Sequence, residues 1–247
     1  MYFRPNTVPE ACTLAVDHPH AALVGGGTIL LAAPGQLRPR ALIDLSALPL
    51  REIVYAAGTW QIGALCTLWQ IGQTSFGPAL RALQQAGAGM GPRAVARQAS
   101  VGGNVCIGGS LTAPLHLLQA TATVVSHAGV RTSLLRDLRL AAGELLVDVQ
   151  LPDTDGESRY SSVRRTHLGP AIAAVAVRCA GPQMWCTVAG GGTVSPVLGP
   201  WSVVEPVVGA DWQGWQPAGD PLASAQYRRA LVLELVERER QVLANIF

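Results

Sequence analysis

The chain has 247 residues, of which 49% are hydrophobic and 14% are charged, and its formal net charge is +2. This length accommodates one large domain or two smaller ones, and so apolar a composition excludes an intrinsically disordered protein. The small net charge, without any basic run, gives no indication of a nucleic-acid surface.

All 18 basic residues are arginines, which excludes any mechanism that depends on a lysine Schiff base or a lysine phosphate clamp. The five cysteines contain no Cys-x-x-Cys pair, which argues against a disulfide framework and against an iron–sulfur or zinc site in this chain. No apolar segment reaches membrane-spanning length, and the N-terminal residues do not resemble a signal peptide. We therefore expect a cytoplasmic protein.

The first part of the chain predicts short helices and strands. Thr7 followed by Glu10 forms a capping-box pattern, which predicts a helix ending near Ala15. Apolar runs bounded by turn residues predict strands at 21–24, 41–44, 51–56 and 59–64, with a loop at 34–39 and a hairpin turn at Gly58. Helices are predicted at 68–73 and 78–86, after which residues 87–91 end the pattern.

The remainder predicts one more helix, several strands and a long final helix. A proline at the first position predicts a helix at 114–121. Strands follow at 123–126, 130–134, 144–151, 160–165, 171–178 and 184–189, and a helix at 223–243 has its apolar face at Leu231, Leu233, Leu235, Val236 and Val242. Residues 152–158 are the best candidate linker, dividing residues 1–153 from 159–247.

The first of two informative glycine turns directly follows the strand at 21–24. It reads Gly25-Gly26-Gly27-Thr28. Because glycine has no side chain, the backbone N–H groups of such a turn can converge on an anion such as a pyrophosphate, and Thr28 adds a hydroxyl group. The spacing matches neither the Gly-x-Gly-x-x-Gly fingerprint nor a Walker loop. An ordinary tight connection between a strand and a helix explains this turn alone equally well.

The second glycine turn contains Ser100, Gly102, Gly103 and Asn104. It predicts two amides and a carboxamide directed at the same ligand, and the alternative is a β-bulge or a loop that needs a positive φ. More glycines follow closely, so residues 97–110 are predicted to be an irregular functional loop. The two turns together predict a cradle that holds a long phosphorylated ligand from both sides.

Other patterns give no functional indication. The third glycine run, residues 190–193, predicts a turn between strands without a ligand. The five histidines have no metal-ligand spacing, and no Gly-x-Ser-x-Gly elbow supports a hydrolase triad.

Further motifs extend the pattern over nearly the whole chain. They are Tyr2-Phe3-Arg4-Pro5 before the Glu10-Ala11 helix, Ile62-Gly63-Ala64 with Thr67, Gly143-Glu144-Leu145-Leu146 with Leu151-Pro152, Arg164-Arg165 with Ala171-Ile172-Ala173, and Tyr227-Arg228-Arg229-Ala230-Leu231. With the two glycine turns they resemble the FAD-binding medium subunit of the molybdenum hydroxylases, the family of xanthine dehydrogenase, carbon monoxide dehydrogenase and quinoline oxidoreductase.

The resemblance implies an α+β (mixed α/β) fold. An FAD-binding domain of the PCMH type, made of two subdomains, would occupy residues 1–153, and a small C-terminal domain of antiparallel strands plus helices would occupy residues 159–247. It implies partners that carry iron–sulfur centres and molybdopterin, and a small-molecule or protein electron acceptor. The flavin would relay electrons from the iron–sulfur centres to that acceptor.

The resemblance also implies which residues hold FAD. No side chain is expected to act as a catalytic acid or base, and none as a metal ligand, because the flavin supplies the redox chemistry. The implied FAD-binding residues are Val24, Gly25, Gly26, Gly27, Thr28, Ser100, Gly102, Gly103, Asn104, Thr112, Leu146 and Arg165.

The chain departs from the family pattern at three places. Val95-Ala96-Arg97 stands where the family has Ile-Arg-Asn, Thr112 is the polar residue nearest to the family's FAD-binding Asp, and Ile29 stands where Asp, Asn or Ser is common. Three alternatives therefore stay open: a stand-alone flavin enzyme acting on a small organic substrate, a family member that has lost FAD and serves as a binding or scaffold protein, and a generic nucleotide-binding domain.

Overall fold

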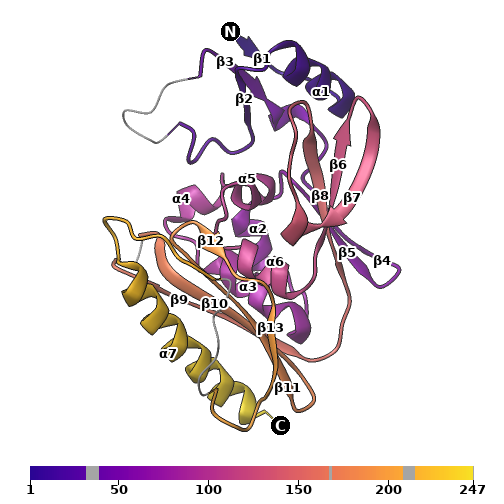
Figure 1. Cartoon of the computed structure of the whole chain (residues 1–247). Helices are drawn as coiled ribbons and strands as arrows, with labels where there is room; N and C mark the ends of the chain where they lie inside the picture. Colours follow the sequence, from indigo (N-terminus) through magenta and orange to yellow (C-terminus); the bar gives the residue numbers. More distant parts are fainter. Residues whose placement is uncertain (32–38, 167–168, 208–214, 247) are drawn as a thin grey trace.

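The computed structural model describes residues 1–31, 39–166, 169–207 and 215–246. In this part of the chain the strands form three sheets (Figure 1). One is a small parallel sheet near the N-terminus, and the other two are five-stranded sheets whose paired strands are antiparallel. The described helices include none that is long and apolar enough to cross a membrane.

The N-terminal sheet consists of β1 (Tyr2–Phe3), β3 (Ala41–Asp44) and β2 (Ala21–Val24), in that order. Helix α1 (Val8–Asp17) begins as predicted, because the hydroxyl of Thr7 accepts a hydrogen bond of 3.3 Å from the N–H of Glu10. The helix continues to Asp17 rather than ending near Ala15. Residues 34–38 of the predicted loop lie outside the described residues.

The central sheet has the strand order β4-β5-β8-β6-β7. Its strands are β4 (Ile53–Ala56), β5 (Thr59–Gly63), β6 (Thr121–Ser126), β7 (Gly129–Leu134) and β8 (Leu145–Pro152). The predicted hairpin at Gly58 is confirmed, and β6 and β7 pair as a second hairpin. Ala57 and Gly58 take positive φ angles of 49° and 74°, as a two-residue hairpin turn requires.

Five short helices lie between the two antiparallel sheets (Figure 1). They are α2 (Leu68–Gln73), α3 (Arg81–Ala88), α4 (Arg93–Ala96), α5 (Val101–Cys106) and α6 (Thr112–Leu117). Two predictions here were wrong. Gly87 lies inside α3 rather than after it, because α3 packs closely on α2 at that point. Helix α6 begins at Thr112 and ends at Leu117, before the positive φ of 53° at Gln119, so Pro114 stands in its first turn but not at its first position.

The C-terminal sheet has the order β12-β11-β10-β9, with β13 paired to β11. Its strands are β9 (Glu157–Arg164), β10 (Ala171–Ala180), β11 (Gln183–Gly190), β12 (Thr193–Val194) and β13 (Leu198–Ser202). Helix α7 (Ala225–Ala244) covers its outer face (Figure 1). Since β9 already begins at Glu157, the connection from β8 is shorter than the predicted linker.

The buried face of α7 differs from the prediction. Leu235 and Val236 are buried, but Leu233 and Val242 are exposed. The buried face of α7 includes the charged residue Glu239. Its carboxylate accepts hydrogen bonds of 2.7 Å from Arg159 and 2.8 Å from Ser161 of β9. The apolar pattern alone did not reveal that this helix packs partly through ion pairs.

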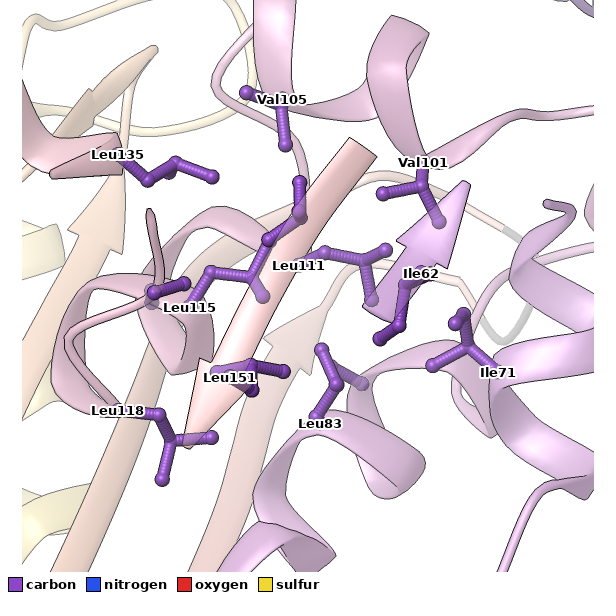
Figure 2. Close-up of a cluster of buried hydrophobic side chains, with 14 of the residues drawn as sticks. Ile62, Ile71, Leu83, Val101, Val105, Leu111, Leu115, Leu118, Leu135 and Leu151 are labelled. Carbon is purple, nitrogen blue, oxygen red and sulfur yellow. The ribbon is translucent and has the colours of Figure 1, made fainter. Parts of the chain in front are cut away.

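The largest hydrophobic cluster joins the central sheet, helices α2 to α6 and the C-terminal sheet. Figure 2 shows part of it, including Ile62, Leu83, Leu111 and Leu151. Tyr160 of β9, together with Ala174 and Ala176 of β10, belongs to the same cluster. The two parts of the chain on either side of residues 153–156 therefore share one core.

Hydrogen bonds also link these two parts. The N–H of Ala82 in α3 donates to the hydroxyl of Ser158, at 2.9 Å. The hydroxyl of Thr187 in β11 donates to the carbonyl of Ala113 in α6, at 2.7 Å. These bonds are buried, so they fix the C-terminal sheet against the helices.

We expect Gly87→Ala to destabilise the protein. A β-carbon on residue 87 would lie 2.8 Å from the backbone nitrogen of Gly72 and 2.8 Å from the carbonyl oxygen of Leu68, so α2 and α3 would have to separate. The expected loss in the free energy of unfolding is about 1–3 kcal/mol, measured by urea denaturation. The control is Gly219→Ala, whose β-carbon would meet no heavy atom closer than 3.7 Å. Equal stability of the two variants would show that α2 and α3 are not held at this close approach.

Candidate functional site

The first glycine turn follows the carboxyl end of β2. No hydrogen bond joins the backbone N–H groups of Gly25, Gly26, Gly27 or Thr28 to another described residue. The carbonyl of Gly27 accepts a hydrogen bond of 3.0 Å from the N–H of Leu31, which closes the turn. The turn therefore presents several donors without a partner among the described residues, as an anion-binding turn does.

The two glycine turns lie in direct contact. A β-carbon on Gly26 would overlap the carbonyl oxygen of Gln98, and one on Gly25 would lie 2.7 Å from the hydroxyl oxygen of Ser100. The prediction that the two turns converge is consistent with this packing. The expected reason for the glycine at residue 26 was wrong, because it makes room for the backbone of the second turn and not for a ligand.

The second glycine turn is a helix start and not an irregular loop. Ser100 is the N-cap of α5, and its hydroxyl accepts a hydrogen bond of 3.2 Å from the N–H of Gly103. The N–H of Gly102 donates to the carbonyl of Ala64 at 2.8 Å, and that of Asn104 to the carbonyl of Ser100 at 2.9 Å. The predicted role of this turn as an amide donor is therefore wrong, because these N–H groups already have partners.

Asn104 holds the segment that follows α5. Its carboxamide oxygen accepts a hydrogen bond of 2.9 Å from the N–H of Leu111, and a β-carbon on Gly109 would overlap its side chain. The residue is buried and lines the cavity described below. Its oxygen is thus already engaged within the protein.

A large cavity opens beside the two turns, with a volume of about 890 Å³. This is within the range of about 300–1,000 Å³ that is typical of ligand pockets. Leu65, Leu145 and Leu146 make part of its wall apolar, and Ala174 and Ala189 of the C-terminal sheet also line it. The cavity is therefore assembled from both parts of the chain.

Ten of the predicted binding residues line this cavity, and two do not. The ten are Val24, Gly25, Gly26, Gly27, Thr28, Ser100, Gly102, Gly103, Asn104 and Leu146. Thr112 is buried elsewhere, and its hydroxyl has no hydrogen-bond partner among the described residues. Arg165 lines a separate groove and donates a hydrogen bond of 3.4 Å to the carbonyl of Pro221.

Arg164 lines the cavity, whereas Arg165 does not. Arg164 is the last residue of β9, whereas Arg165 lies in the bend that follows the strand. An error of one residue in the alignment therefore assigned the positive charge to the wrong arginine. The guanidinium of Arg164 donates to the carbonyl of Gly169 at 3.0 Å, and it forms no ion pair with a described carboxylate. It remains available to a negatively charged ligand.

The carboxylate of Glu144, on the cavity wall, is paired with an arginine. Both oxygens of Glu144 accept hydrogen bonds of 2.7 Å from the guanidinium of Arg131, and one also accepts from the N–H of Ala141 at 2.8 Å. The hydrogen bonds from Arg131 lower the pKa of Glu144 to about 2. Glu144 therefore stays ionised and paired, and repels an anionic ligand less than a free carboxylate would.

The third glycine run forms the predicted turn between strands, since it joins β11 to β12, but its place on the cavity wall was not predicted. Gly190 ends β11, Gly191 and Gly192 follow it, and all three line the cavity. The last two have positive φ angles of 60° and 77°. The available signal was the repeat of the string Gly-Gly-Gly-Thr directly after a strand.

In the described residues, no three His, Cys, Asp or Glu side chains cluster as metal ligands would.

The family model described as the FAD binding domain in molybdopterin dehydrogenase matches residues 1–154. No curated protein matches the chain in sequence.

Solved structures match over almost the whole chain. Quinoline 2-oxidoreductase from Pseudomonas putida 86 has a TM-score of 0.85 at 22% identity, with 99% of this chain and 96% of that chain covered. Carbon monoxide dehydrogenases from Hydrogenophaga pseudoflava and Oligotropha carboxidovorans have TM-scores of 0.81 and 0.84 at 21% identity, each with 96% of this chain and 94% of the other covered. These matches confirm the predicted fold.

We expect Glu144→Gln to weaken the acid dependence of stability. Because the pKa of Glu144 is lowered on folding from 4.5 to about 2, its ionised form stabilises the protein above pH 4.5, and this contribution is lost as the pH falls toward 2. Urea denaturation as a function of pH should give a smaller stability for the variant at neutral pH and a flatter slope in acid. Glu234→Gln, on the exposed face of α7, is the control. An unchanged slope in Glu144→Gln would show that the pair with Arg131 does not form.

Proposed function

Because the chain belongs to the family of FAD-binding domains in molybdopterin dehydrogenases, we propose that it holds FAD in the large cavity and acts as the flavin-bearing subunit of a multi-subunit oxidoreductase. The observation that carries this proposal is the set of N–H groups at the first glycine turn that have no partner among the described residues, on the wall of a cavity of about 890 Å³.

The residues of the cavity fit a dinucleotide cofactor. The N–H groups of residues 25–28 suit the oxygens of a diphosphate. The surface at Gly103 is open, since a β-carbon there would meet only the hydroxyl oxygen of Ser100, at 3.0 Å. A buried hydroxyl on the cavity wall, that of Ser110, has no hydrogen-bond partner among the described residues. These are features of a wall that is completed by a polar ligand.

In this proposal the chain's own residues bind FAD and orient it. The first turn holds the diphosphate, Ser100 and Gly103 shape the opposite side, and Leu146 excludes water from the flavin ring. Arg164 supplies a positive charge. The flavin, when bound, supplies the redox chemistry, so no side chain needs to transfer a proton.

We further propose an electron relay. FAD bound here would accept electrons from the iron–sulfur centres of a second subunit and pass them to an external acceptor, and a molybdopterin-bearing subunit would oxidise the substrate. Family membership supports this role. Exposed apolar side chains also surround the first turn, since Ile29 is 57% exposed and Leu31 is 64% exposed. Such a patch favours contact with a partner protein.

The same proposal places the FAD-binding domain at residues 1–153 and the C-terminal domain at residues 159–247, in a cytoplasmic complex. The shared hydrophobic cluster described above would join these two proposed domains beside the cavity.

The purified chain should be yellow, and Gly103→Val should lower its affinity for FAD about tenfold or more, because the added methyl groups enter the cavity. The measurements are the flavin absorption spectrum, the mass of the released cofactor and a titration of apoprotein with FAD. Circular dichroism should show that the variant is folded, and Gly219→Ala should bind FAD normally. A colourless wild-type chain that takes up no FAD would point to a scaffold role and refute the proposal.

Leu31→Asp should slow the reduction of bound FAD by the iron–sulfur subunit about tenfold, while the affinity for FAD stays the same. A charge at this site would disrupt an apolar contact with the partner. The rate is measured by stopped-flow absorbance with the reduced partner subunit. Val204→Asp is the matched control, because Val204 is 66% exposed and lies outside the cavity. Equal rates in both variants would show that the patch at the first turn is not the electron entry side.

A further inference from the structure

A second hollow lies outside the large cavity. It is a groove of about 470 Å³, lined by the end of β9, the start of β10 and the segment that leads into α7. Its volume is within the range of about 300–1,000 Å³ that is typical of small-molecule sites. Of the residues that line it, only Arg164 also lines the large cavity. The proposed binding of FAD therefore leaves the rest of the groove without a role.

The groove contains more hydrogen-bond donors than the protein uses. Arg165 donates a hydrogen bond of 3.4 Å to the carbonyl of Pro221, and Arg164 donates one of 3.0 Å to the carbonyl of Gly169. Neither guanidinium forms an ion pair with a described carboxylate. Because a guanidinium carries five N–H groups, most of these donors are left for a ligand.

The negative charge in the groove is already balanced. Asp220 is the only carboxylate among the described residues that line it. Its Oδ1 atom accepts hydrogen bonds of 2.8 Å from the N–H of Leu222 and 3.1 Å from the N–H of Ala223, and it lies 2.5 Å from Nη2 of Arg228. The two arginines of the lining therefore give the groove an excess of positive charge.

A buried guanidinium adds to this charge from below. The side chain of Arg228 is 1% exposed, and it donates to the carbonyl of Ile172, which lines the groove. Its Nε atom has no hydrogen-bond partner among the described residues. The 20-residue helix α7 also begins here, with Ser224 as its N-cap, so its positive end lies at the groove. Both features favour an anion.

The composition of the groove indicates the kind of anion. A phosphate group suits these donors, because its oxygens can accept paired hydrogen bonds from a guanidinium. The groove is larger than a phosphate group requires, and Val163, Leu222 and Tyr227 also line it. Tyr227 is 50% exposed, so its ring can pack against a planar organic group.

We propose that the groove at the start of α7 binds a small phosphorylated organic molecule, with the phosphate at Arg165 and the organic part against Tyr227. This site is separate from the cavity assigned to FAD, and the inference does not rest on the proposed function.

The test is calorimetric titration of the purified chain with phenyl phosphate and with inorganic phosphate, at constant ionic strength. Binding of phenyl phosphate should saturate. Arg165→Gln should raise the dissociation constants of both probes about tenfold, because charged hydrogen bonds are lost. Tyr227→Ala should raise the constant for phenyl phosphate about threefold and leave that for inorganic phosphate unchanged. Circular dichroism should show that both variants are folded.

The matched control is Arg229→Gln, which removes the same charge from an exposed residue of α7 outside the groove. It should bind both probes as wild type does. The inference is overturned if phenyl phosphate does not bind saturably, if Arg165→Gln binds like wild type, or if the two arginine variants lose affinity equally. A chain that takes up no FAD but gives the expected titrations would refute the proposed function and leave this inference standing.

Discussion

The close approach of two stretches of backbone determines the rest of this structure. The carbonyl of Gln98 occupies the space where a side chain on residue 26 would lie, so only glycine permits the first turn to pack on the segment before α5. This contact brings the end of β2, from the N-terminal sheet, close to the cap of α5. The residues of the first turn thereby line the cavity. Every feature assigned to the site, from the diphosphate donors to the wall at Gly103, depends on that contact.

The cavity also needs the C-terminal sheet, and the shared core explains why the two parts keep their relative position. Small side chains such as Ala174 and Ala189 leave space at the sheet surface, whereas larger residues would fill it. The buried bond between Thr187 and Ala113 resists sliding of the sheet over α6. A ligand bound here would contact elements far apart in sequence, and its affinity would report on the integrity of the whole fold. In the proposed function this rigidity keeps the flavin in one orientation between its electron donor and its acceptor.

The two glycine turns contribute in different ways, although their sequences look alike. In the first, the N–H groups have no partner among the described residues, and the turn can act through hydrogen bonds. In the second, the N–H groups are used by the helix cap and by the carbonyl of Ala64, so the turn acts through its shape. A glycine-rich string indicates that the backbone is accessible, but not whether its donors are free. That depends on which carbonyls the fold places opposite them.

The sequence by itself determined the local elements and the family resemblance. Caps such as Thr7 and hairpin turns such as Gly58 depend on contacts within a few residues, which a pattern can record. Only the tertiary structure decided that Arg164 and not Arg165 reaches the cavity, that Thr112 does not, and that the third glycine turn forms part of its wall. The physical reason is that the cavity is assembled from elements far apart in the sequence. Which residues reach it is set by the layers that pack on the two faces of the C-terminal sheet, here α7 on one side and the helices with the glycine turns on the other.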